Sequence, residues 1–145
     1  MVSVFGKGNG RKGQVAIEYI LMSAFLLLVV GVLFVHSYTQ YDRTMKIEMT
    51  QHAVDSLGEA ADQAYALGTG SVLFVDMDLP YGIEGYTVTQ KNITLKLNLI
   101  GVQDTVFTRT VADLNMFSAI PTSPTRHRMR VSMGATNITL QEVFD

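Results

Sequence analysis

The chain has 145 residues, enough for one domain, and its formal net charge of −2 disfavours a protein that binds nucleic acid through a basic face. It contains no cysteine, which excludes a disulfide framework and thiolate metal sites. Hydrophobic residues make up 48% of the chain and are concentrated near the N-terminus.

Residues 1–13 form a short segment that is rich in glycine and carries the cations Lys7, Arg11 and Lys12. A basic glycine-rich loop can bind phosphate, but no strand precedes this one and no Gly-Lys-Ser/Thr ends it, so the Walker pattern is absent. We interpret residues 1–13 as a flexible leader. Its removal would change the net charge from −2 to −5, because three cations leave with it.

An apolar run of 21 residues extends from Val15 to Val35 and contains one residue that is charged at neutral pH, Glu18. A helix needs about 20 such residues to cross a bilayer core of roughly 30 Å. The run is longer than the apolar core of a cleaved secretory signal, and no small-residue cleavage site follows it. The cations before the run place the N-terminus in the cytoplasm by the positive-inside rule. We therefore expect residues 14–35 to be retained as a membrane helix.

Glu18 needs its own explanation, because an acid at the centre of a membrane helix costs about 2.5–3.5 kcal/mol and somewhat less near an end. One interpretation is a side chain that snorkels to the interface from an ordinary signal anchor. The other is a functional carboxylate, and the residues around it favour that interpretation.

The junction of leader and apolar run resembles the processing site of type IV prepilins, and in particular the class III signal peptides of archaeal pilins. The residues that carry the resemblance are Lys12-Gly13-Gln14 and Glu18-Tyr19, with Ala16 where that pattern has Ser. The resemblance implies that a prepilin peptidase cleaves between Gly13 and Gln14, and that Gln14, Glu18 and Tyr19 serve assembly into a homopolymer.

The same resemblance implies further partners and a location. A pilus assembly ATPase and a platform protein would act on a precursor held in the cell membrane. The mature chain would then become part of an extracellular filament, serving adhesion.

In such a filament Glu18 is expected to meet the α-amine of Gln14 on a neighbouring subunit. An α-amine has a reference pKa of about 7.7–8.0 and is largely charged at neutral pH. Pairing the two buried charges would fix the axial register of the helices. Since an N-terminal Gln can cyclise, this interpretation also predicts a free α-amine at Gln14.

Beyond Val35 the apolar residues recur every three or four positions, which predicts an amphipathic helical segment over residues 36–68. Gly68 and Gly70 are typical of a helix end. The pattern predicts one helix from Gln14 to Leu67, about 80 Å long at 1.5 Å per residue. The predicted stripe consists of Tyr38, Tyr41, Met45, Met49, Ala53, Leu57, Ala60, Ala64 and Leu67.

Residues 69–145 change to short alternating runs separated by turn residues, which predicts a β-rich head. We expect five or six antiparallel strands, over residues 71–75, 83–89, 93–99, 105–111, 128–133 and 138–143. The predicted fold class is α+β: a long N-terminal helix packed against a small antiparallel β-sheet head.

Two sequons, Asn92-Ile93-Thr94 and Asn137-Ile138-Thr139, predict N-glycosylation at Asn92 and Asn137, although turn-forming Asn is the alternative. Arg126, Arg128 and Arg130 alternate and would share one face of a strand. Such a stripe is a contact for an acidic neighbour, a contact for nucleic acid if a pilus handles DNA, or, as we favour, a solvated face.

We expect no enzyme activity, cofactor or metal. The histidines have no metal-ligand spacing, and no Gly-x-Ser-x-Gly elbow occurs. The expected function is therefore structural, as a filament subunit. The main alternative is a single-pass membrane protein whose head binds a partner outside the cell and which does not polymerise.

Overall fold

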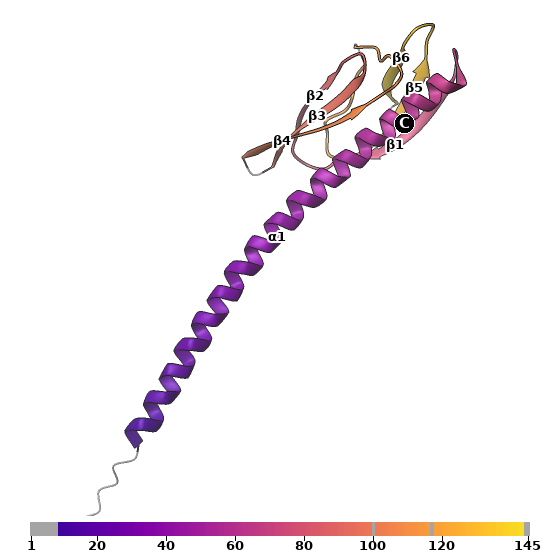
Figure 1. The fold of residues 1–145 in the computed structure, drawn as a ribbon. Helices are drawn as coiled ribbons and strands as arrows, with labels where there is room; N and C mark the ends of the chain where they lie inside the picture. Colours follow the sequence, from indigo (N-terminus) through magenta and orange to yellow (C-terminus); the bar gives the residue numbers. More distant parts are fainter. Residues whose placement is uncertain (1–8, 100, 117, 144–145) are drawn as a thin grey trace, which may run out of the picture. The chain divides into compact units, whose positions relative to one another are not determined.

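The computed structural model describes the backbone of residues 9–99, 101–116 and 118–143, with side chains from residue 14 onward. This part of the chain forms one helix followed by six strands (Figure 1). It divides into two compact units, one ending at Tyr41 and the other beginning at Asp42. We call residues 14–41 the shaft and residues 42–143 the head.

Helix α1 runs from Asn9 to Leu67 and therefore begins before the predicted start at Gln14. No proline occurs in residues 9–13, so nothing in this segment forces the helix to begin later. The predicted cleavage bond, Gly13–Gln14, thus lies in helical backbone. Residues 1–8 of the predicted leader lie outside the described residues.

The predicted helix end is confirmed. The N–H of Gly68 donates to the carbonyls of Ala64 at 3.1 Å and Tyr65 at 3.2 Å, and Gly68 has a φ of +92°. Glycine adopts this left-handed conformation without a Cβ penalty, which makes it a common helix terminator. The hydroxyl of Ser71 donates to the same Ala64 carbonyl at 2.8 Å.

The six strands form two three-stranded antiparallel sheets rather than the single small sheet that the sequence predicts. Sheet A has the order β1-β5-β6 and sheet B the order β2-β3-β4. Sheet B is a meander of sequence neighbours, whereas β1 pairs with β5 across the whole meander. The strands are β1 (Val72–Asp78), β2 (Ile83–Val88), β3 (Asn92–Leu99), β4 (Val102–Arg109), β5 (Arg126–Met133) and β6 (Ile138–Val143).

Strand β4 lies earlier in the chain than the predicted residues 105–111. Leu99 pairs directly with Val102, and Gly101 has a φ of +78°. A tight turn that uses this positive φ starts the strand sooner than the alternation alone indicates.

The core of the head lies between α1 and the inner faces of the sheets. Leu57 on the helix is fully buried, as are Leu95 of β3 and Val131 of β5. The predicted helical stripe is correct at Ala53, Leu57, Ala60 and Ala64, which are buried. It is wrong at five positions, where the side chain is exposed: Tyr38, Tyr41, Met45, Met49 and Leu67.

The error follows from helix geometry. Steps of four residues advance more than one full turn, so a series of such steps drifts around the helix. The face that is buried in the head is instead centred on Thr50, Val54, Leu57 and Ala61.

Polar contacts also join α1 to β4 and the segment after it. The guanidinium of Arg43 donates to Asp104 through Nε at 3.0 Å and Nη2 at 2.8 Å. Further along the helix, Oδ1 of Asp62 accepts the N–H groups of Val111 at 2.8 Å and Ala112 at 3.1 Å. These contacts fix the position of the helix relative to β4 within the head.

Candidate functional site

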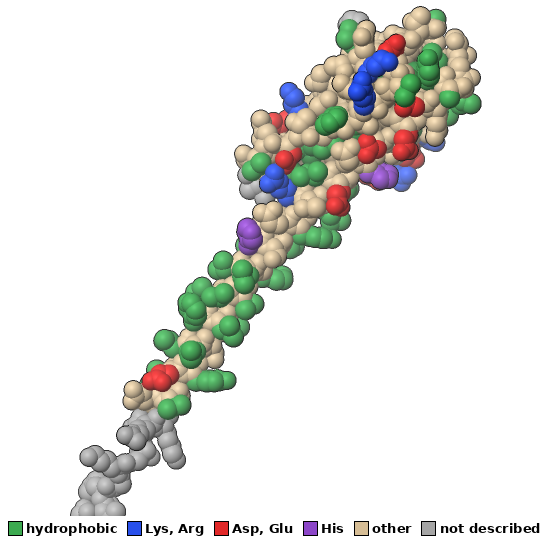
Figure 2. Space-filling view, viewed as in Figure 1, with side chains coloured by type: hydrophobic (Ala, Val, Ile, Leu, Met, Phe, Trp, Pro, Cys, Tyr) green, Lys and Arg blue, Asp and Glu red, His purple; other side chains and the backbone are tan. Residues whose placement is uncertain are grey.

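The shaft exposes its apolar side chains. Leu21 is 71% exposed and Leu28 63%, and Figure 2 shows hydrophobic side chains along the shaft while most charged ones lie on the head. The most apolar window of the helix has a mean hydropathy of 2.5, and none of it is buried. Monomeric soluble proteins rarely leave so large an apolar surface uncovered.

In the described part of the chain, this is the one helix that is long and apolar enough to cross a membrane. Its place near the N-terminus fits membrane insertion or a secretion signal. In either case the exposed apolar surface suits contact with lipid or with other chains.

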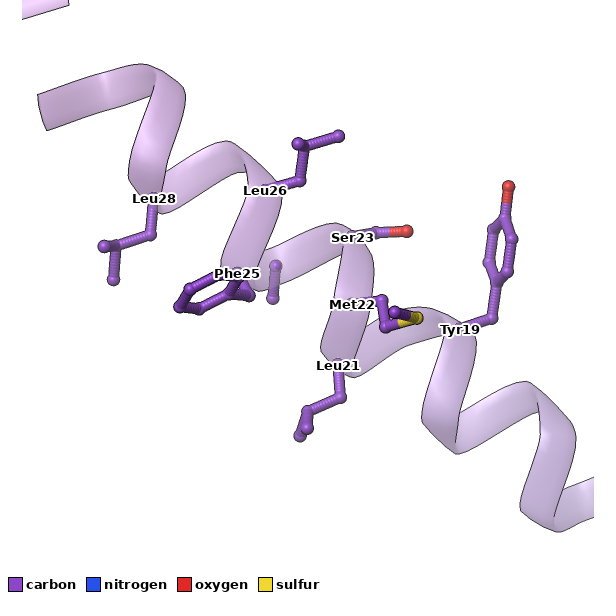
Figure 3. Close-up of a pocket in the computed structure, with 8 residues that line it drawn as sticks. Tyr19, Leu21, Met22, Ser23, Phe25, Leu26 and Leu28 are labelled. Atoms are coloured by element: carbon purple, nitrogen blue, oxygen red, sulfur yellow. The ribbon is translucent and has the colours of Figure 1, made fainter. Parts of the chain in front are cut away.

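Figure 3 shows a hollow on the shaft that is formed by side chains of α1 alone. Leu21 and Leu28 point to one side in this view, and Tyr19 and Leu26 to the other. The hollow is therefore a gap between side-chain ridges of the kind that another helix fills, rather than an enclosed ligand cavity. Its lining consists of Tyr19, Leu21, Met22, Ser23, Ala24, Phe25, Leu26 and Leu28.

The predicted assembly residues Gln14, Glu18 and Tyr19 all lie exposed on the shaft. Within the described residues, no hydrogen bond or ion pair involves the side chain of Glu18. Gln14 and Glu18 are one helical turn apart on α1, and a single chain contains no neighbouring subunit with which to pair. Their roles in cleavage and assembly stay predictions.

The two sequons lie in different surroundings. Asn92 is the first residue of β3 and is exposed. Asn137 is half-buried in the turn between β5 and β6, where its carbonyl accepts the N–H of Gly134 at 2.9 Å. Glycosylation at both positions stays a prediction.

The alternation predicted for β5 is confirmed, with the arginines exposed and His127, Met129 and Val131 buried. Arg126 lies 3.2 Å and Arg128 3.6 Å from the carboxylate of Asp76. Arg128 also lies over the ring of Phe74, 5.5 Å from its centroid. Two of the three cations are therefore neutralised by their own chain, which favours the solvated-face interpretation.

The sequence did not reveal that His127 is the centre of a polar network. Its Nδ1 lies 2.6 Å from the carboxylate of Glu142, and its Nε2 lies 2.9 Å from the carbonyl of Ser123 and 3.0 Å from the hydroxyl of Thr125. The network ties the segment before β5 to β6. The available signal was alternation, which places His127 on the same face as two apolar residues.

Nothing in the described ranges resembles a metal centre, since no group of three or more His, Asp or Glu side chains is placed to hold an ion. Comparison with known proteins gave no matching family model, and no characterised protein or solved structure is detectably similar to the chain. The architecture itself is type IV pilin-like: a long N-terminal apolar helix whose later part packs against antiparallel sheets.

Proposed function

We propose that this protein is a structural subunit of an archaeal type IV pilus-like surface filament. Residues 1–13 would be the cleaved leader, residues 14–68 the long helix and residues 69–145 the β-rich globular region that follows it. Residues 14–35 would form the membrane segment of the precursor and later the filament core, and the heads would lie outside and serve adhesion.

The exposed shaft is the observation that supports this proposal most. Its apolar side chains surround the helix, so no single face is reserved for the chain's own head. Transfer of such a helix from lipid to a bundle of helices gives little hydrophobic gain, because lipid is equally apolar. Assembly therefore needs close packing and a specific polar contact.

Glu18 is the residue that supplies the polar contact. Its carboxylate lies in the most apolar part of the chain, and none of the described side chains pairs with it. A charge in such surroundings persists when a partner compensates it, and the new α-amine of Gln14 on a neighbour has the right charge. A prepilin peptidase would create that amine, and an assembly ATPase with a platform protein would drive the transfer from the membrane.

The alternative, a membrane-anchored binding protein that does not polymerise, explains the apolar shaft but gives Glu18 no role. Two measurements on the surface-exposed protein separate the two functions. N-terminal sequencing is expected to begin at Gln14 with a free amine, and electron microscopy of sheared material is expected to show filaments that contain this chain.

A Glu18→Gln variant tests the residue itself. It is expected to be cleaved normally and to remain dispersed in the membrane without forming filaments. Glu59→Gln is the matched control, because Glu59 is an exposed carboxylate on the same helix within the head. Recovery of the wild-type chain uncleaved and only as single molecules in membranes would contradict the proposal.

A further inference from the structure

We propose that the heads of neighbouring subunits dock through two different surfaces of this chain. One is a basic aromatic patch on sheet B, formed by Lys96, Phe107 and Arg109. The other is an apolar groove between α1 and β1 that is bordered by acidic residues. The inference rests on the proposed filament, and it specifies which surfaces of the heads meet.

The patch lies on the outer face of sheet B and is centred on Phe107, whose side chain is 63% exposed. Phe107 pairs with Thr94, and Lys96 pairs with Thr105, so Lys96 is a diagonal neighbour of Phe107 on that face. Arg109 follows two positions along β4 and points to the same side. Neither cation forms an ion pair or hydrogen bond with any described residue.

The groove is lined by residues 48–53 of α1 and by the end of β1, and it has a volume of about 370 Å³. Its apolar lining includes Met49, which is 40% exposed, and the buried Met77. Glu48 and Asp78 border it, and in the described structure their carboxylates have no cationic or hydrogen-bonding partner. The complete lining is Glu48, Met49, His52, Ala53, Asp76, Met77 and Asp78.

The two surfaces are complementary in polarity and charge. An aromatic ring flanked by two unpaired cations matches a methionine-lined groove flanked by two unpaired carboxylates. Methionine sulfur makes favourable contacts with aromatic rings and adapts to their shape. Charge complementarity of this kind selects the partner and fixes its register.

The contact is heterologous, because the patch and the groove are different surfaces. A heterologous contact leaves one free patch and one free groove after each addition, and it produces an open helical assembly when the rotation does not close. An isologous contact would stop at a dimer. The pair of surfaces therefore fits a filament subunit.

The patch has one competing occupant. Asn92 pairs with Arg109 on the same outer face of sheet B, so a glycan at Asn92 would cover the patch. We favour a neighbouring head, because the two unpaired carboxylates of the groove supply counter-charges for the two cations. Docking consequently requires that Asn92 is unmodified in assembled filaments, contrary to the glycosylation that its sequon predicts. Glycopeptide mapping that finds a glycan there would overturn the inference.

A charge exchange in the full-length chain tests the contact. Lys96→Glu combined with Arg109→Glu is expected to reduce the yield of sheared filaments about tenfold or more, because like charges would then face each other. Glu48→Lys combined with Asp78→Lys is expected to have the same effect. The variant with all four changes is expected to recover filaments, which misfolding of either double variant could not explain.

Arg130→Glu is the control, since Arg130 is an exposed cation on sheet A outside both surfaces. Carbodiimide crosslinking of wild-type filaments gives a second measurement. It is expected to join Lys96 to Glu48 or Asp78 in filaments but not in dispersed subunits.

Wild-type filament yield from both double variants would overturn the docking contact and leave the proposed function intact. Failure of the fourfold variant to recover filaments, or absence of the crosslink, would also overturn it. Absence of filaments from the wild-type chain would instead contradict the proposed function itself.

Discussion

The shaft and the helical part of the head belong to one continuous helix, yet they meet their surroundings in opposite ways. Leu28 in the shaft is 63% exposed, whereas Leu57 in the head is fully buried. The head segment places charged residues on one side and a buried stripe on the other, so its partner is its own sheets. The shaft is apolar on all sides and therefore has its partners outside the chain.

Polar contacts sharpen the same contrast. In the head, Arg43 and Asp62 bond to β4 and to the segment after it, which fixes the helix in one position. Among residues 14–41, Thr39 donates to the carbonyl of His36 at 2.8 Å, a contact within the helix. The head is thus held in place by contacts within the chain, whereas the described residues supply no such contacts for the shaft.

The largest expected effect comes from replacing one leucine in the head with alanine, compared with the same replacement in the shaft. Leu57→Ala is expected to destabilise the head by about 2–5 kcal/mol, because it removes a fully buried side chain and leaves a cavity. Leu28→Ala is expected to leave head unfolding unchanged. Calorimetry of the full-length chain in detergent measures both, and equal losses from the two variants would break the contrast.

Much of the fold follows from the sequence because the hydrophobic period changes at Gly68. Up to Leu67 the apolar spacing is helical, and after Ser71 it alternates, so the helix and the six strands are all predictable. Strand partners are not, since the pairing of β1 with β5 is a long-range contact that no local period encodes. The predicted face of the helix is also wrong at several positions, because apolar residues spaced three or four apart fit more than one line along the helix surface.

The candidate site shows a different limit. The apolar run and its lone carboxylate at Glu18 are evident in the sequence, and the structure confirms that the shaft is uncovered. The proposed partner of Glu18 belongs to another chain, so the fold of a single chain does not identify it. His127 was overlooked because a histidine beside apolar residues gives no local sign of which oxygens it will meet.

The second prediction concerns Gly58, which sits where α1 and β4 approach closely. A Cβ at this position would lie 2.8 Å from Cγ2 of Thr108, closer than real Cβ contacts allow. Gly58→Ala is therefore expected to destabilise the head by about 1–3 kcal/mol through overpacking, although alanine is the better helix former. Gly58→Ala with Thr108→Ser, which removes the clashing methyl group, should recover stability. Stabilisation by Gly58→Ala alone would disprove the close approach.

A smaller effect is expected at Asp62, whose carboxylate accepts two backbone N–H groups after β4. Asp62→Ala is expected to cost about 1 kcal/mol, because both N–H groups lose a carboxylate acceptor and only that of Val111, an exposed residue, can readily bond to water instead, whereas Ala112 is buried. The matched control is Glu59→Ala, an exposed acid on the same helix for which the described residues supply no hydrogen-bond partner. Thermal unfolding that is equally affected by both substitutions would show that Asp62 acts only through its charge.

The smallest effect is expected at Gly31, the counterpart of Gly58 in the shaft. Apart from the adjoining residues and the helix's own backbone, no atom lies within 4 Å of the position that a Cβ would take at Gly31, so packing within the chain does not require a glycine there. Gly31→Ala is expected to stabilise the helix of dispersed subunits by about 1 kcal/mol at most, measured as helix content during thermal unfolding in detergent. In filaments the sign should reverse, because small residues let neighbouring helices approach closely. A variant that is more helical when dispersed but assembles less would show that a neighbouring helix packs against Gly31, as Thr108 packs against Gly58. Unchanged assembly would place the helix contacts elsewhere on the shaft.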